Sequence, residues 1–282
     1  MTAESPRGTG TAAVNSPEKH DQPGTTEILN LNDVTLRFPG AQRPAIQHVS
    51  FRVSQGKFVA VIGPSGCGKS TILNLSAGLI KPTRGEVRFN GRRVREVNTD
   101  AAYITQAANL LPWLTVKGNI GLGLKLRGFP QEQREDRIAG WIDLVGLNGF
   151  EDNFPRELSG GMQKRCSIAR ALIYDPSIVL MDEPFGPLDA ILRLRLQQEL
   201  LNIWDSNSGT VVFVTHDLTE AICLADEVVV MSRGPGTVRG VVPVPIPRPR
   251  DVVSVMESHE FAELHDELWE LFKSEIGPPK GA

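Results

Sequence analysis

GPSGCGKST, at positions 63–71, is the most informative stretch of this sequence. It follows an apolar run at residues 58–62 and precedes a segment, residues 71–79, that has the apolar spacing of a helix. A strand, a glycine-rich turn and a helix in this order are the context that a phosphate-binding loop (P-loop) requires. The P-loop residues are Gly63, Pro64, Ser65, Gly66, Cys67, Gly68, Lys69, Ser70 and Thr71.

The residue types in this loop fit a nucleoside triphosphate. Glycines let the backbone turn tightly, so that successive N–H groups and the helix N-terminus form an anion site. Lys69 is expected to reach the β- and γ-phosphates, and the Ser70 hydroxyl suits Mg²⁺, which prefers oxygen ligands. An ordinary glycine-rich turn is the alternative, and the agreement between motif and context argues against it. A helix N-terminus favours a thiolate, so Cys67 is predicted to be reactive, or else to be only a small loop filler.

Composition bounds the class of protein. The chain has 282 residues, enough for one large domain or two small ones, with 40% apolar and 22% charged residues, as in ordinary globular proteins. A formal net charge of −3 argues against a general nucleic-acid binder. No apolar run approaches the ~18 residues of a membrane-spanning helix, so a membrane role is expected to go through a partner. The three cysteines have no metal-ligand or disulfide spacing, which predicts a reduced, cytoplasmic setting.

Acidic residues and a histidine follow two later apolar runs. Residues 177–181 read as a buried parallel strand that delivers Asp182 and Glu183 at its carboxyl end, where ligand sites of open α/β sheets lie. Asp182 is predicted to hold Mg²⁺ through water, and Glu183 to polarise an attacking water; a solvated acidic pair is the alternative. The strand at residues 210–215 ends at His216, which is predicted to contact the γ-phosphate, although a lone histidine is usually structural.

Residues 107–158 differ from their surroundings and read as a helical insertion. Thr115 is predicted to cap a helix that runs to residue 126, and residues 131–147 have helical spacing. A proline-interrupted apolar stretch precedes the cap. Its large side chains fit either packing within the insertion or a docking surface for another protein: Leu110, Leu111, Trp113 and Leu114.

Two further features concern a nucleotide. Ser159, Gly160 and Gly161 open a helix and so form a second anion-binding geometry, which fits either a nucleotide held by another subunit or a simple N-capped helix. Phe38 ends the strand predicted at residues 28–38 and fits equally an adenine-stacking platform or a core aromatic.

The ends of the chain are predicted to be accessory. Residues 1–26 are rich in Pro, Gly, Thr and Ser and read as a disordered tail rather than a signal peptide. Residues 27–245 are predicted to form the main domain. Residues 246–282 are predicted to form a linker and an amphipathic helix at 260–276.

Together these motifs resemble an ATP-binding subunit of ABC transporters over nearly all of residues 27–275. The matches, in chain order, are Phe38 for the A-loop aromatic (usually tyrosine), residues 63–71 for Walker A, Gln106 for the Q-loop, residues 158–162 for the signature, residues 178–182 for Walker B followed by Glu183, residues 186–189 for the D-loop, and His216 for the switch histidine. Departures from the usual pattern are Ala107, Met162, Gln163-Lys164 and Pro187.

The resemblance implies an α/β P-loop NTPase fold with a RecA-like core, an antiparallel β subdomain and a helical subdomain at about residues 107–173. It implies ATP and Mg²⁺ as ligands. The catalytic residues would be Glu183, His216, Gln106 and Lys69, with Mg²⁺ held by Ser70, Gln106 and Asp182. ATP would lie between the P-loop and Phe38 of one copy and Ser159, Gly160 and Gly161 of a second copy packed head to tail.

The resemblance also implies partners. These are transmembrane permease subunits reached through the Gln106 region and, through the permease, an extracytoplasmic solute-binding protein, with the chain at the cytoplasmic face of the membrane. Residues 110–116 and 184–190 resemble the corresponding segments of importers of nitrate, aliphatic sulfonates or taurine. A soluble ABC ATPase acting on DNA or ribosomes usually carries long coiled-coil insertions or fused ATPase domains, which this sequence lacks, so no nucleic-acid partner is expected. A P-loop kinase would not need the signature or His216.

Overall fold

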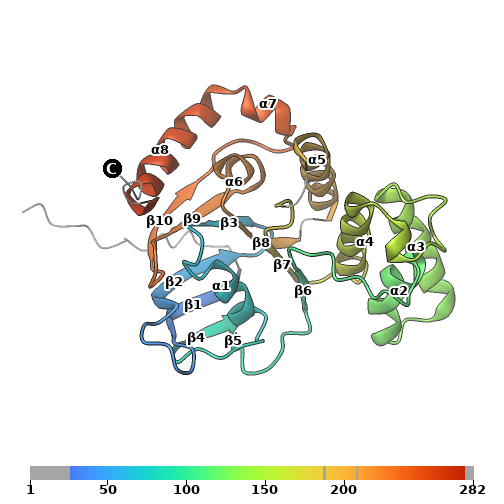
Figure 1. Ribbon diagram of the computed structural model, residues 1–282, viewed down its shortest axis with the longest axis horizontal. Helices are drawn as coiled ribbons and strands as arrows, with labels where there is room; N and C mark the ends of the chain where they lie inside the picture. The colour runs from blue at the N-terminus through green and yellow to red at the C-terminus, as the bar shows by residue number, and fades with distance from the viewer. Residues whose placement is uncertain (1–25, 187–188, 208, 277–282) are drawn as a thin grey trace, which may run out of the picture.

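A twisted six-stranded sheet forms the centre of the computed structural model, which describes residues 26–186, 189–207 and 209–276 (Figure 1). Its strand order is β10-β9-β3-β8-β7-β6, and every neighbouring pair is parallel except β10 with β9. The strands are β3 (Phe58–Ile62), β6 (Ala101–Ile104), β7 (Ile178–Asp182), β8 (Thr210–Thr215), β9 (Glu227–Met231) and the edge strand β10 (Val238–Pro243).

The central strands are buried on both faces. In β3, Phe58, Ala60 and Ile62 belong to one hydrophobic core, while Val59 and Val61 belong to the core on the opposite face. This two-sided burial explains why the runs that form β3, β7 and β8 are apolar without alternation, and it confirms that they are buried parallel strands.

A smaller antiparallel sheet, ordered β2-β1-β4-β5, covers one face of the central sheet (Figure 1). Its strands are β1 (Glu27–Leu36), β2 (Ile46–Ser54), β4 (Arg84–Phe89) and β5 (Arg92–Arg93). Helix α1 (Lys69–Ser76) shares the core between the two sheets through Ile72, Leu73 and Leu75.

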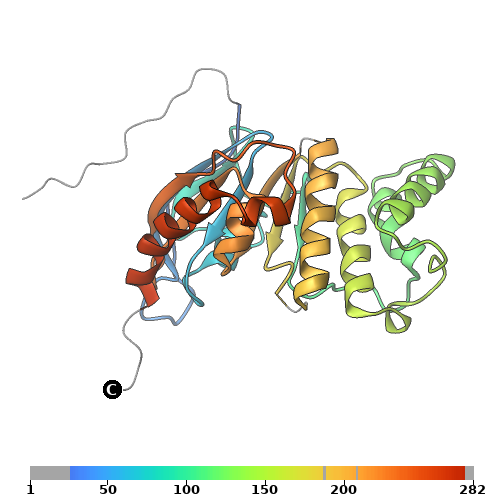
Figure 2. The same cartoon turned by 90° about the horizontal axis from the view of Figure 1, so that it is seen from above.

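The opposite face is covered by helices α5 (Ala190–Asn207), α6 (Leu218–Leu224), α7 (Val252–Met256) and α8 (His259–Ile276) (Figures 1 and 2). The predicted C-terminal helix is therefore confirmed, and a short α7 precedes it. Val252, Val255, Leu264 and Leu268 join the core of the central sheet. The predicted boundary at about residue 245 stays a prediction, and the predicted tail falls, except for Thr26, outside the described residues.

Helices α2 (Val116–Leu126), α3 (Gln131–Leu144) and α4 (Gly160–Leu172) form the helical subdomain at one end of the molecule (Figures 1 and 2). A one-turn 3₁₀ helix, Pro155–Glu157, precedes α4. The subdomain has its own hydrophobic core. Thr115 caps α2 as predicted, because its Oγ1 accepts the N–H of Gly118 at 3.2 Å. Helix α3 ends earlier than predicted, since Gly146 has φ +60° just beyond it, a conformation in which glycine commonly ends helices.

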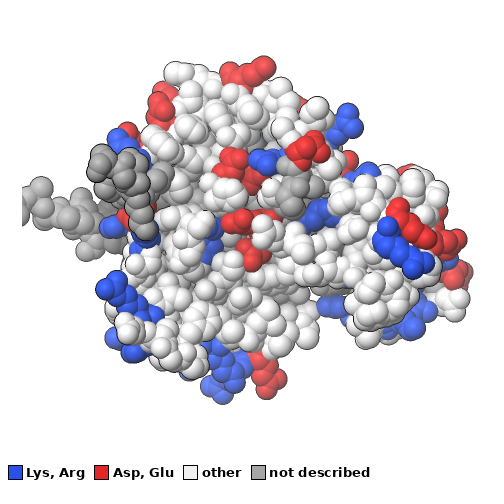
Figure 3. Space-filling view, in the orientation of Figure 1, with Lys and Arg blue, Asp and Glu red and all other residues white. Residues whose placement is uncertain are grey.

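Charged side chains of both signs lie on the surface of the molecule. Basic and acidic side chains are interspersed on the face drawn in Figure 3, and much of that face is uncharged, in line with 30 Lys plus Arg against 33 Asp plus Glu.

Among the helices of the described residues, none combines the length and the apolar character needed to cross a membrane.

Candidate active site

Four adjacent strands of the central sheet, β3, β8, β7 and β6, end at one edge. In the register, Ile62 pairs with Thr215, Asp182 with Val214, and Ile104 with Met181. Parallel strands end at the same side, so the segments that follow them meet there. These segments contain the P-loop, His216, Glu183 and Gln106.

The P-loop glycines are required by close approaches of the backbone. Gly66 and Gly68 have φ of +79° and +99°, which side chains other than glycine rarely adopt. A β-carbon on Gly68 would lie 2.3 Å from Cγ2 of Ile46, and one on Gly63 would lie 2.7 Å from Sγ of Cys67. The P-loop therefore packs closely against Ile46 of β2 and against the side chain of its own Cys67.

The Lys69 side chain folds back onto the main chain of the P-loop. Its side chain is only 6% exposed, and its ammonium donates to the carbonyl of Gly63 at 2.8 Å and to that of Pro64 at 3.4 Å. The same nitrogen lies 3.9 Å from Oε1 of Glu183. The structure thus brings the predicted phosphate-binding cation and the predicted water-polarising carboxylate together.

Ser70 and Asp182 present oxygens side by side. The Ser70 hydroxyl donates to Oδ1 of Asp182 at 3.0 Å. Burial raises the pKa of Asp182, and the hydrogen bond from Ser70 acts against this rise. One carboxylate and one hydroxyl suit a hard divalent cation that keeps waters and takes its other ligands from phosphates, so these residues fit Mg²⁺.

Tyr103 is a residue of this site that the sequence analysis missed. It lies in β6 beside Leu180 of β7, near enough to Asp182 for the carboxylate charge to act on the phenol. Burial, with the Asp182 charge, raises the pKa of Tyr103, so the phenol stays protonated beside the carboxylate. A single tyrosine in a four-residue strand carries no sequence signal for this contact.

Glu183 is held by an unusual backbone conformation. Its φ is +42°, rare for a residue with a side chain, and its N–H donates to the carbonyl of Val214 at 3.0 Å. Oε2 of Glu183 lies 3.3 Å from Nδ1 of His216, whose side chain is more than half exposed. Strain of this kind is often found at functional sites.

The residue before His216, Thr215, belongs to a buried hydrogen-bond network with Glu220 and Gln197. The Thr215 hydroxyl donates to Glu220 at 2.6 Å, and the Gln197 amide donates to the other carboxylate oxygen at 3.2 Å. Burial raises the pKa of Glu220, and the hydrogen bond from Thr215 opposes that rise. Asp217 caps α6 by accepting the N–H of Thr219 at 2.8 Å. The turn that carries His216 is therefore fixed on both sides.

Gln106 is exposed and points its amide toward the Glu183 turn. A β-carbon on Gly186 would lie 3.3 Å from Nε2 of Gln106 and 3.9 Å from Oε2 of Glu183. Gly186 therefore leaves space for both side chains. Of the predicted D-loop, residues 187 and 188 lie outside the described residues.

The prediction that Cys67 is a reactive thiol is wrong. Its side chain is only 1% exposed, and burial raises the pKa of the thiol. The nearby Lys69 charge lowers it by less than burial raises it. Cys67 fills the loop instead, against Gly63, while its backbone still belongs to the P-loop.

Phe38 lies just beyond β1 and is 46% exposed, so it is not a core aromatic. It lines an open hollow with its neighbours at residues 37–42 and Thr83. Its role as a stacking platform stays a prediction.

Ser159 is the N-cap of α4, and its role in binding an anion stays a prediction. Oγ of Ser159 accepts the N–H of Met162 at 3.3 Å, and Ser159 and Gly160 are exposed. Close packing against α5 requires a glycine at position 161, because a β-carbon on Gly161 would lie 2.6 Å from Cδ2 of Leu192. Helices α4 and α1 stand well apart in Figure 1, so this segment does not join the P-loop of its own chain.

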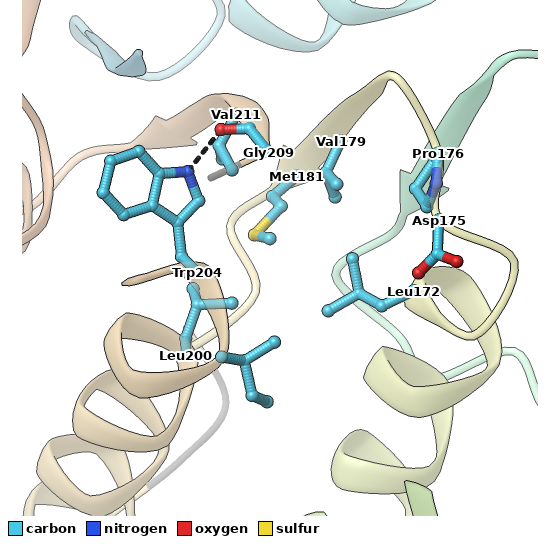
Figure 4. Close-up of a pocket in the computed structure, with 10 residues that line it drawn as sticks. Leu172, Asp175, Pro176, Val179, Met181, Leu200, Trp204, Gly209 and Val211 are labelled. Carbon is cyan, nitrogen blue, oxygen red and sulfur yellow. Dashed lines mark hydrogen bonds between the residues drawn. The ribbon is translucent and has the colours of Figure 1, made fainter. Parts of the chain in front are cut away.

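An apolar pocket of about 390 Å³ lies elsewhere, between α5, the end of α4 and strands β7 and β8 (Figure 4). Trp204, Leu200 and Leu172 line it, and the Trp204 indole donates to the carbonyl of Gly209 at 2.7 Å. This pocket does not include the residues gathered at the strand ends.

A family model described as "ABC transporter" matches residues 46–186 of this chain. The chain belongs to the ABC transporter family. An uncharacterised ABC transporter ATP-binding protein of Methanocaldococcus jannaschii is 43% identical over 250 residues, which is 89% of this chain and 92% of that protein. An aliphatic sulfonates import ATP-binding protein of Bacillus cereus is 41% identical over 248 residues, covering 87% of this chain and 96% of that protein.

Solved structures agree with this ABC assignment. A dimeric ATP-binding cassette in a post-hydrolysis state, bound to ADP and Pi, superimposes with a TM-score of 0.69 at 30% identity, covering 78% of this chain and all of that one. The chain has the ABC ATPase cassette fold, and it is an ATP-hydrolysing ABC transporter subunit.

Proposed function

We propose that this ABC ATPase drives import of a small anion such as an aliphatic sulfonate, nitrate or taurine, at the cytoplasmic face of the membrane. Support comes from the name of the Bacillus cereus relative and from the likeness of residues 110–116 and 184–190 to importers of these anions. Among the three, the name of the relative favours aliphatic sulfonates.

The observation that carries the ATP-driven part of this proposal is the separation of the P-loop from the Ser159 segment within one chain. The P-loop is at the carboxyl end of β3, whereas the exposed Ser159 and Gly160 open α4 at the helical subdomain. Two copies packed head to tail would bring the P-loop of each copy to Ser159 of the other. The dimeric state of the similar cassette with ADP and Pi supports this arrangement.

The residues of each copy would then have distinct tasks. Lys69 would exchange the carbonyls of Gly63 and Pro64 for phosphate oxygens, and the P-loop N–H groups would bind the same phosphates. Ser70, Asp182 and Gln106 would hold Mg²⁺, which neutralises phosphate charge when bound. Phe38 would stack on adenine.

Glu183 would act on the attacking water. Its carboxylate lies between the Lys69 ammonium and the His216 ring, so it is oriented from two sides. Glu183 would accept a hydrogen bond from water, while His216 and Gln106 would orient the γ-phosphate and the water.

A permease would dock beside Gln106. Trp113 is 69% exposed, on the segment that links β6 to α2, although Leu110, Leu111 and Leu114 beside it are half-buried. Tryptophan is among the residues most enriched in binding hot spots. A solute-binding protein would deliver the anion to the outer side of the permease.

The direct test is transport in vesicles that contain this chain and its permease, with ATP inside and the solute-binding protein outside. ATP-dependent uptake of an aliphatic sulfonate, nitrate or taurine, abolished by Glu183→Gln, is the expected result. ATP hydrolysis that responds to DNA or ribosomes, with no association with the permease, would instead support the soluble ABC ATPase.

A further inference from the structure

The segment between β6 and α2, residues 105–114, has no helix or strand but is extensively hydrogen-bonded to the helical subdomain. We call it the Q-loop segment. The Lys164 ammonium donates to the carbonyls of Thr105 at 2.8 Å and Gln106 at 3.2 Å. The Arg170 guanidinium donates to the carbonyls of Ala108 at 3.1 Å and Asn109 at 2.9 Å.

Asn119 of α2 continues this pattern at the other end of the Q-loop segment. Its amide donates to the carbonyls of Leu111 at 3.1 Å and Leu114 at 3.0 Å, and its oxygen accepts the N–H of Leu111 at 2.8 Å. Asn119 is fully buried. Three side chains of the helical subdomain thus bind main-chain groups along nearly the whole Q-loop segment.

Of these three side chains, Lys164 is the one whose burial is least expected. It is 3% exposed, and burial lowers its pKa to about 8, partly opposed by the charge of Asp182. Burying an ammonium costs free energy unless hydrogen bonds compensate it. The sequence departs from the usual signature pattern at this residue, where glutamine is more common. Lys164 and Arg170 are six residues apart on α4, and both side chains reach the Q-loop segment.

We propose that Lys164 and Arg170 are positioning residues that fix the main chain of the Q-loop segment to α4 and thereby set where the Gln106 amide lies beside the Glu183 turn.

This arrangement deepens the proposed function, on which its link to the permease rests. Trp113 and Gln106 belong to the same fastened segment. A permease bound at Trp113 would therefore contact the same segment that carries Gln106. The fastening itself is a property of the isolated chain and is measurable without a permease.

The variants follow from the contacts. Lys164→Met keeps the length and apolar stem but removes the donor, and Lys164→Gln restores one donor on a shorter side chain. Arg170→Met removes the second fastening. Arg165→Met is the matched control, because Arg165 lies on the same helix and donates to the carbonyls of Val145 at 2.8 Å and Gly146 at 3.3 Å, outside the Q-loop segment.

The first measurement is hydrogen–deuterium exchange of the full chain without nucleotide. Lys164→Met and Arg170→Met are expected to speed exchange of peptides that cover residues 105–114, while Arg165→Met leaves them unchanged. Unchanged exchange in both Lys164→Met and Arg170→Met would overturn the proposal. If Lys164→Met does not fold, the comparison between wild type, Lys164→Gln and Arg170→Met decides in the same way.

The second measurement is steady-state ATP hydrolysis by the same proteins. Misplacing Gln106 is expected to lower kcat about 10- to 100-fold with KM for ATP nearly unchanged, and Lys164→Gln is expected to recover part of the loss. An equal loss in Arg165→Met would mean that α4 matters only for folding and would overturn the positioning role. Failure of anion transport alone would refute the proposed function while leaving both results in place.

Discussion

Oε2 of Glu183 lies 3.3 Å from Nδ1 of His216, and these two residues come from different strands, β7 and β8. The contact depends on the positive φ of Glu183, which turns the carboxylate back toward the neighbouring strand end. On its other side the carboxylate faces the Lys69 ammonium at 3.9 Å. The residues that follow β7 and β8 and the first residue of α1 therefore meet at one carboxylate.

Lys69→Ala should abolish ATP hydrolysis and weaken nucleotide binding, because the buried cation that faces the phosphates is lost. Hydrolysis assays and binding of a fluorescent ATP analogue measure both effects. Lys273→Ala is the matched control, since Lys273 is exposed on α8 and, within the part of the chain that the structure describes, pairs with Glu270. Wild-type turnover by Lys69→Ala would remove the P-loop from the mechanism.

Gly160→Ala and Gly161→Ala should separate function from packing. A β-carbon at Gly160 meets no atom within 4 Å, whereas one at Gly161 meets Leu192 at 2.6 Å. Gly161→Ala should therefore lower the free energy of unfolding by about 1–3 kcal/mol. Gly160→Ala should keep its stability but lose hydrolysis, because the new methyl group would enter the partner's nucleotide site.

Denaturant unfolding and ATP hydrolysis measure the two glycine variants side by side. Full activity of Gly160→Ala would mean that the exposed start of α4 does not approach a nucleotide.

Cys67 should react slowly with an alkylating reagent at neutral pH. Burial raises its pKa, so the reactive thiolate is scarce and the side chain is shielded. The rate, followed by peptide mass spectrometry, should increase as the pH rises toward that raised pKa. Fast labelling at pH 7 that ATP blocks would instead restore the reactive thiol predicted from the sequence.

Trp113→Ala should reduce assembly with the permease while ATP hydrolysis by the isolated subunit stays near wild type. The exposed indole makes little contribution to the core of its own chain. Co-purification yield measures assembly. Trp269→Ala provides the control, because Trp269 is also exposed but lies on α8, away from the Q-loop segment. An equal yield for both variants would assign Trp113 to packing within the subdomain.

Much of the fold followed from the sequence because its signals are local. Apolar runs without alternation predicted β3, β7 and β8, and the hydroxyls of Thr115 and Ser159 predicted the starts of α2 and α4. Motif spacing then predicted which strand ends carry Glu183 and His216, which the structure brings together.

What the sequence missed depends on burial and on contacts between distant segments. The helix N-terminus argument for Cys67 omitted desolvation, which is the largest influence on its pKa. Tyr103 reaches Asp182 only because β6 and β7 are neighbours in the sheet. Lys164 would ordinarily be expected on a solvated helix face, and its burial becomes visible only with the Q-loop segment folded against α4.

Glu183→Gln tests whether two copies of this chain share each nucleotide. The amide keeps the size of the side chain but loses the basicity that activates water, an effect on the order of 10²–10⁴-fold. Lys69, Ser70 and the P-loop N–H groups are unchanged, so ATP should still bind. Light scattering of Glu183→Gln should therefore detect a dimer with ATP and a monomer with ADP, and adding Ser159→Arg should return the ATP sample to monomer. A Glu183→Gln protein that binds ATP yet stays monomeric, or a dimer that Ser159→Arg does not disturb, would contradict the shared site.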